Sequence, residues 1–194
     1  MNFKAIFGAV IVASLIVLSA TAATGVPGWV MAGSEPKAYE MGIAETGGQA
    51  RGPAAFLQST AGPINGFGTM MQMFDVGDYA GKRVRFSGAV RSEAVKDWAG
   101  LWLRVDGENN RPLAFDNMQR RPIKGTAGWQ RYDVVLDVAP EAKKIAMGVL
   151  ISNSGKVWLD DVKFEVVPAS VATTNMPAVP PSESGPKNLG FARP

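Results

Sequence analysis

The chain has 194 residues and a formal net charge of +3, and it contains neither Cys nor His. These two absences exclude disulfide bonds, a Ser-His-Asp triad, a Cys-His dyad, and zinc sites with nitrogen or sulfur ligands. The 20 basic residues are scattered among 17 acidic ones, so we expect no nucleic-acid partner.

The first segment has the pattern of a secretory signal peptide. A short basic start at 1–4 precedes an almost wholly apolar run at 5–18, and Ala20-Thr21-Ala22 offers the small residues that signal peptidase accepts. The sequence therefore predicts a signal peptide at 1–22 and a periplasmic or secreted protein, with no membrane span after its removal. The alternative is an uncleaved anchor, for which the apolar run is slightly short.

The region 27–167 alternates apolar and polar residues with a period of two, which is typical of half-buried strands. In 101–106, for example, Leu101, Leu103 and Val105 alternate with Trp102, Arg104 and Asp106. Gly, Pro and Asn separate such runs at intervals of roughly ten residues. The predicted strands are 29–32, 37–43, 54–58, 68–76, 83–91, 100–106, 112–115, 130–138, 144–152 and 156–166.

Many short strands without a helical stripe predict an all-β fold, specifically an antiparallel β-sandwich of the jelly-roll type. From Pro168 onward the composition changes to Pro, Ser and Thr, which predicts a disordered tail at 168–194. Within this tail, Val179-Pro180-Pro181 has an alternative interpretation as a ligand for a proline-binding groove.

Motifs along the folded region resemble the galactose-binding-like jelly rolls, the carbohydrate-binding modules often grouped as families four and nine. The segments that carry this resemblance are 39–42, 52–57, 79–87, 128–132 and 157–166. A narrower likeness is to a bacterial domain of unassigned role, found alone or appended to regulators and hydrolases. It is carried by 66–72, 98–106, 113–118 and 121–126.

Two adjacent acids, Asp160 and Asp161, interrupt the last predicted strand. The modules that the chain resembles often hold a structural calcium between their first and last strands, and this resemblance implies Glu40 and Asp161 as oxygen ligands. Calcium is a hard cation that prefers such ligands. The alternative is that one Asp accepts backbone N–H bonds while the other is solvated.

Trp102, Arg104 and Asp106 share one face of their strand, opposite the leucines, and we expect Gln72 beside them. Flat aromatic rings and planar polar groups are what a sugar-binding surface requires. The alternative is that Trp102 packs beneath a crossing loop while Arg104 and Asp106 form a local ion pair. Three further Trp residues complete the aromatic set: Trp98, Trp129 and Trp158.

Asp116 and Asn117 are candidates for the rim of a binding groove, although a turn alone explains this residue pair. The leading interpretation is an exported, non-catalytic binding module for carbohydrate or another polar envelope ligand. One alternative is a structural protein that docks a partner through a sheet face. The other is a carboxylate-dependent glycoside hydrolase or lyase using Asp106, Asp116 or Glu108.

Overall fold

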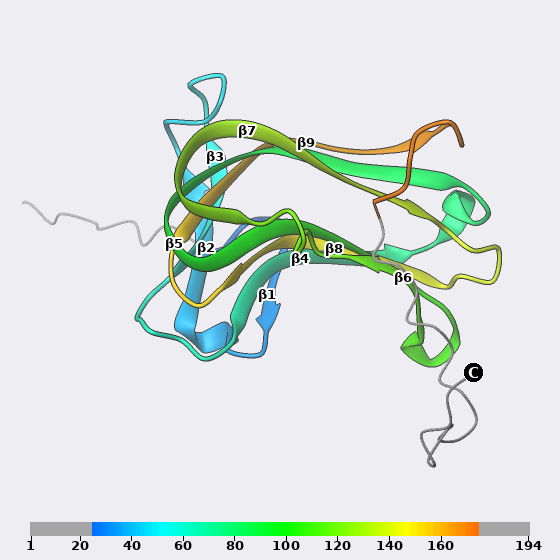
Figure 1. Ribbon diagram of the computed structural model, residues 1–194, viewed down its shortest axis with the longest axis horizontal. Coiled ribbons are helices and arrows are strands. Elements are labelled where there is room, and N and C mark those ends of the chain that lie inside the picture. The colour runs from blue at the N-terminus through cyan, green and yellow to red at the C-terminus, as the bar shows by residue number, and fades with distance from the viewer. Residues whose placement is uncertain (1–24, 175–194) are drawn as a thin grey trace, which may run out of the picture.

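The computed structural model describes residues 25–174, which form two antiparallel β-layers (Figure 1). An apolar core lies between the layers. The predicted signal peptide and residues 175–194 of the predicted tail lie outside the described residues. The strands are β1 (Val30–Gly33), β2 (Tyr39–Ala44), β3 (Ala54–Ser59), β4 (Phe67–Asp75), β5 (Arg83–Asp106), β6 (Pro112–Asp116), β7 (Ile123–Asp137), β8 (Lys144–Ser152) and β9 (Lys156–Val167). Three short 3-10 turns, η1 (Pro36–Ala38), η2 (Gly77–Tyr79) and η3 (Glu108–Asn110), connect them.

The long strand β5 belongs to both layers. Its second half pairs with β8 and β6, and β8 pairs with β4, which in turn pairs with β1. Its first half pairs with β7 and β9, and β9 leads through β3 to β2. We call the layer of β1, β4, β8, β5 and β6 the groove sheet, and the other layer the opposite sheet.

Strand β5 bends between the layers near Ala94, whose φ of 50° lies in the left-handed region. The register with β7 shifts on both sides of this residue, as expected where extra residues are accommodated in a ladder. The sequence predicted two strands, 83–91 and 100–106, with a break between them. That break is a bend within one continuous strand, because hydrogen bonds to β7 carry the ladder through it.

Inward-facing side chains come from both layers at the predicted period of two. On β5, Leu101, Leu103 and Val105 are fully buried in the main core cluster, whereas Trp102 belongs to a separate cluster on the outside of the sheet. The same alternation places Ile145 and Val149 of β8 in the core. The predicted all-β jelly-roll sandwich is therefore confirmed.

The chain remains attached to the sandwich beyond its last strand. Arg83 donates from Nη1 to the carbonyl oxygens of Ala169 and Val171, each at 2.6 Å. Thr174 donates its backbone N–H to the carbonyl of Val135 on β7, at 2.8 Å. The tail predicted to begin at 168 therefore does not begin before 175. Composition did not indicate this attachment, which is made by hydrogen bonds to the backbone of Ala169 and Val171 and to the backbone and hydroxyl of Thr174.

Within residues 25–174, no helix has the length and apolar character needed to cross a membrane.

Candidate functional site

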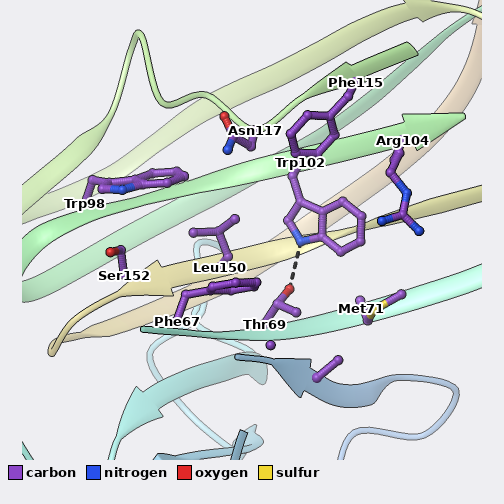
Figure 2. A pocket seen from close by; sticks show the side chains of 12 residues that line it. Phe67, Thr69, Met71, Trp98, Trp102, Arg104, Phe115, Asn117, Leu150 and Ser152 are labelled. Carbon is purple, nitrogen blue, oxygen red and sulfur yellow. Dashed lines mark hydrogen bonds between the residues drawn. The ribbon is translucent and has the colours of Figure 1, made fainter. Parts of the chain in front are cut away.

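A groove of about 450 Å³ lies on the outer face of the groove sheet (Figure 2). Four of its lining side chains are aromatic, and the only formally charged one is Arg104. The lining residues are Ala32, Gly33, Phe67, Thr69, Met71, Trp98, Trp102, Arg104, Phe115, Asn117, Leu150 and Ser152. All of them lie on β1, β4, β8, β5 or β6, except Asn117, which directly follows β6. The register between these strands therefore decides which side chains lie next to one another.

The register arranges these side chains in rows across the sheet. Phe67, Ser152 and Trp98 are level with one another on β4, β8 and β5. Four residues further along β5, Trp102 is level with Gly148 and Met71. At about 3.3 Å per residue, the two aromatic rows are separated by about 13 Å along the strand.

Trp102 forms the floor of the groove. Its side chain is on the outer face as the alternation predicts, but only 7% of the residue is exposed because Met71, Trp98 and Phe115 pack around it. Its Nε1–H donates to the Thr69 hydroxyl at 2.7 Å, and that hydroxyl donates to the carbonyl of Val149 at 2.9 Å. The expected open surface is therefore a lined groove with a fixed indole at its base.

Gly148 allows the indole to lie across β8. A Cβ at this position would be 2.4 Å from the carbonyl oxygen of Met70 and 2.9 Å from Nε1 of Trp102. Backbone and indole would both have to move, since real Cβ atoms do not approach so closely.

We therefore expect Gly148→Ala to lower the free energy of unfolding by about 1–3 kcal/mol, the usual range for overpacking. The displaced indole would also lose its bond to Thr69, which near-ultraviolet circular dichroism and urea titration can detect. Gly128→Ala is the matched control, because a Cβ there meets nothing within 4 Å. Equal stability of the two variants would contradict this account of Trp102.

Arg104 and Asp106 form the local ion pair that the sequence offered as an alternative. Oδ2 of Asp106 lies 3.0 Å from Nε and 2.9 Å from Nη2 of Arg104. Asp106 is fully buried, and its Oδ1 has no hydrogen-bond partner within residues 25–174. Asp106 is therefore a partner that orients Arg104, and it does not line the groove.

Gln72 does not join this group. It is level with Met147 and Leu103, which face the core, whereas Trp102 is level with Met71. Its side chain lies near Gly28. The expectation that Gln72 stands beside Trp102 is not met, since neighbouring residues of β4 point to opposite faces.

Asp116 and Asn117 form a turn after β6, as the simpler interpretation predicted. Oδ1 of Asp116 accepts the N–H of Met118 at 2.9 Å, and Oδ2 is paired with Arg121 at 2.8 Å. Asp116 is buried and outside the groove, but Asn117 lines it. The turn thus places one of the two residues at the rim.

Sequence reasoning missed Phe67 and Phe115 as groove residues. The predicted strands 68–76 and 112–115 left Phe67 just outside its strand and placed Phe115 at the end of its own, without assigning either to a groove. The signal that could have found Phe67 is its alternation with Thr69 and Met71, which marks one face of a strand.

The structure does not bring Glu40 and Asp161 together. Glu40 is level with Gln58, which is level with Lys156, five residues before Asp161. This separation is about 16 Å along the strands. Asp161 is paired with Arg131 instead.

Asp160 accepts backbone N–H bonds from Gln49 and Asp161, at 2.8 and 2.7 Å. The alternative interpretation of the two acids therefore describes Asp160 correctly. Within residues 25–174 no group of three or more acidic side chains is placed to hold a metal ion. Calcium binding stays a prediction, and it would need ligands other than the pair Glu40 and Asp161.

No family model matches this chain. Among curated proteins, the uncharacterized HTH-type transcriptional regulator YbfP of Bacillus subtilis (strain 168) is 42% identical over 165 residues. The alignment covers 84% of this chain and 56% of the regulator, so the chain spans little more than half of that relative's length.

Solved structures share the fold at low sequence identity. The CBM22-1 xylan-binding domain of Paenibacillus barcinonensis Xyn10C has a TM-score of 0.55 at 11% identity, covering 73% of this chain and 87% of that domain. The enzymatically active domain of tailspike protein 4 of bacteriophage CBA120 has a TM-score of 0.52 at 11% identity, covering 74% and 20%.

At this identity the likeness shows the fold alone. The predicted resemblance to carbohydrate-binding modules is confirmed at that level, whereas families four and nine and the bacterial domain of unassigned role stay predictions. Because the structural neighbours include both a binding module and an enzyme domain, the function of this chain has to be argued from its groove.

Proposed function

We propose that this chain is an exported, non-catalytic binding module whose groove takes a carbohydrate or another polar ligand of the cell envelope. The observation that carries this proposal is the aromatic lining of Phe67, Trp98, Trp102 and Phe115. Flat rings pack against the apolar faces of sugars, while a few polar groups fix the orientation of the hydroxyls. The likeness to a xylan-binding domain supports this proposal by analogy.

Arg104 and Asn117 are the polar groups best placed to orient such a ligand. Both line the groove beside the aromatic rings, and in Figure 2 Asn117 lies near Phe115 and Arg104 beyond Trp102. Asp106 holds the guanidinium of Arg104 through Nε and Nη2. Because the guanidinium is planar, this contact also restrains the remaining donors of Arg104. A fixed donor loses little conformational entropy when it binds.

The residues that line the groove include no carboxylate, and this favours binding over catalysis. A glycoside hydrolase needs two acids roughly 5–9.5 Å apart across its cleft. Asp106 and Asp116, two of the predicted candidates, are each buried and paired with an arginine outside the groove. Glu108 is an exposed residue of the turn η3, and it does not line the groove either.

The test is affinity electrophoresis of the purified chain in gels that contain soluble polysaccharides, such as xylan, β-glucan and galactan, or peptidoglycan fragments. We expect at least one polymer to retard the wild type and Trp98→Ala to weaken binding by about ten- to a hundredfold. Losing an aromatic contact costs about 1.5–3 kcal/mol, and 1.4 kcal/mol corresponds to a tenfold change.

Trp129→Ala is the matched control, because Trp129 is also partly exposed but lies on β7, outside the groove. If no polymer retards the wild type, or if both variants are retarded as strongly as the wild type, the carbohydrate proposal fails.

A second candidate is docking of a partner protein through the same face. Val30, Phe67 and Met73 are 56%, 38% and 47% exposed. Their positions in the register place all three on the outer side of the groove sheet, around Met71 and Thr69. Large exposed apolar side chains gathered on one face mark an interaction surface. Retention of a partner by both the wild type and Trp98→Ala, with no polysaccharide bound, would favour this function.

A further inference from the structure

We infer that the groove also takes a segment of this same chain, Pro177-Ala178-Val179-Pro180-Pro181. Docked there, the segment would compete with the ligand of the groove. The docking itself is independent of the proposed function, whereas the competition rests on it. Only Asn175 and Met176 separate the segment from the last described residue, Thr174.

The segment has the residue spacing of a polyproline II ligand. Pro177 and Pro180 are three residues apart, which is one turn of that helix, so their rings fall on one side. Proline fixes φ near the required value before binding, and the entropy lost on docking is therefore small.

The groove has the features that such a ligand needs. Aromatic-lined grooves bind proline-rich segments by packing their rings against proline. Trp98 and Phe67 are aligned across β8, since both are level with Ser152. Trp102 and Phe115 line the rest of the groove (Figure 2). A groove lined by lysines or acids would suit this uncharged ligand less well. Here the one charged side chain of the lining, Arg104, is neutralised by its ion pair with Asp106.

The backbone of a polyproline II helix makes no internal hydrogen bonds, so its carbonyl groups need external donors. Arg104 and Asn117 lie on the rim of the groove and can supply them. Asp106 contacts Nε and Nη2 of Arg104, and Nη1 is the donor that remains for a ligand. The Asn117 side chain accepts from Gln119 through Oδ1, and its NH₂ group is the donor for a carbonyl.

The segment can reach the groove within one molecule. Thr174 is fixed to Val135 on β7, and β7 contacts β6, the strand that ends at the groove rim. An extended chain spans up to about 3.3–3.6 Å per residue, so Pro177 lies within about 10 Å of Thr174 and Pro181 within about 25 Å. Because the groove opens on the outer face of its sheet, the segment would cross the layer separation of about 10 Å and then pass around the β6 edge.

Tethering makes even weak docking effective. A segment on a short linker experiences an effective concentration in the millimolar range. When most of the molecules have the groove filled, the apparent affinity for another ligand falls in proportion to the free fraction. For a groove filled in about 70–90% of molecules, this corresponds to about a three- to tenfold loss.

The first test compares the indole N–H signals of the five Trp residues, in nuclear magnetic resonance spectra of the full chain and of a triple variant. The variant is Pro177→Ala, Pro180→Ala and Pro181→Ala, and Pro186→Ala is the control outside the segment. We expect the signals of Trp98 and Trp102 to shift in the triple variant and those of Trp129 and Trp158 to stay. Unchanged Trp98 and Trp102 signals would overturn the inference. The substitutions lie outside the described fold, so loss of folding does not complicate the comparison.

Dilution then separates docking within one molecule from docking between two copies. We expect the spectrum of the wild-type chain to be independent of protein concentration. A signal of Trp98 that moves toward that of the triple variant on dilution would show that the segment comes from a second copy, and this would overturn docking within one molecule.

The competition has its own readout. With a polysaccharide that binds the groove, the triple variant should bind about three to ten times more tightly than the wild type, and Pro186→Ala should match the wild type. Equal affinities would refute the competition. Failure of every polysaccharide to bind either chain would refute the proposed function instead, and the Trp signals would still decide the docking.

Discussion

Replacing Trp102 with Ala should lower the free energy of unfolding by about 3–5 kcal/mol, the range for truncating a large buried aromatic side chain. Trp102 is 7% exposed and packs with Ala146 and Leu150, so its removal leaves an unfilled space at the base of the groove. It also leaves the Thr69 hydroxyl, which is buried, without its donor. Urea unfolding followed by circular dichroism measures the change.

Two related variants separate the contribution of the Trp102 ring from those of its N–H donor and of the neighbouring Trp98. Trp102→Phe keeps a ring but lacks the donor, so its loss should be smaller, about 1–3 kcal/mol, the cost of an unsatisfied buried polar group. Trp98→Ala removes a partly exposed ring of the same groove and should cost less than Trp102→Ala. A loss below about 1 kcal/mol for Trp102→Ala would be incompatible with the fixed floor described above.

Arg104→Met should destabilise the protein by about 3–5 kcal/mol, because it leaves the carboxylate of Asp106 buried without a counterion. The side chain of Asp106 is 0% exposed, and one of its oxygens is held by Arg104 alone. Thermal or urea unfolding near neutral pH, where a free carboxylate is ionised, gives the measurement.

The double variant Arg104→Met with Asp106→Asn should regain most of the lost stability, since the buried charge is then gone. Lys143→Met is a control at an exposed ion pair, because Lys143 and Glu108 are 3.9 Å apart and both side chains are mostly exposed. Its effect should stay within about 1 kcal/mol. If the double variant is no more stable than Arg104→Met, the buried charge is not the cause.

The strands and the burial of their faces could largely be predicted from the sequence. Leu101, Leu103 and Val105 face the core and Trp102 faces outward, as their alternation indicated. This succeeds because the period of two is a local property of extended backbone. The prediction failed at 92–99, which lay between two predicted strands although β5 continues through a bend there.

The candidate site could be predicted from the sequence only in part. Trp102 and Arg104 were found because they share one strand, and Asn117 because it follows a turn pattern. Gln72 was placed on the wrong face, since an error of one residue in register reverses every side chain of a strand. Phe67 and Phe115 were missed because they lie 48 residues apart in sequence and meet only through β8 and β5.

The sequence by itself determined the two-sided strands and the absence of Cys and His chemistry. Only the tertiary structure decided that four aromatic rings from three strands converge on one groove, and that Asp106 serves Arg104 rather than a ligand. The physical reason is that alternation is set by neighbouring residues, whereas convergence depends on strand order and register, which are fixed by hydrogen bonds between distant segments.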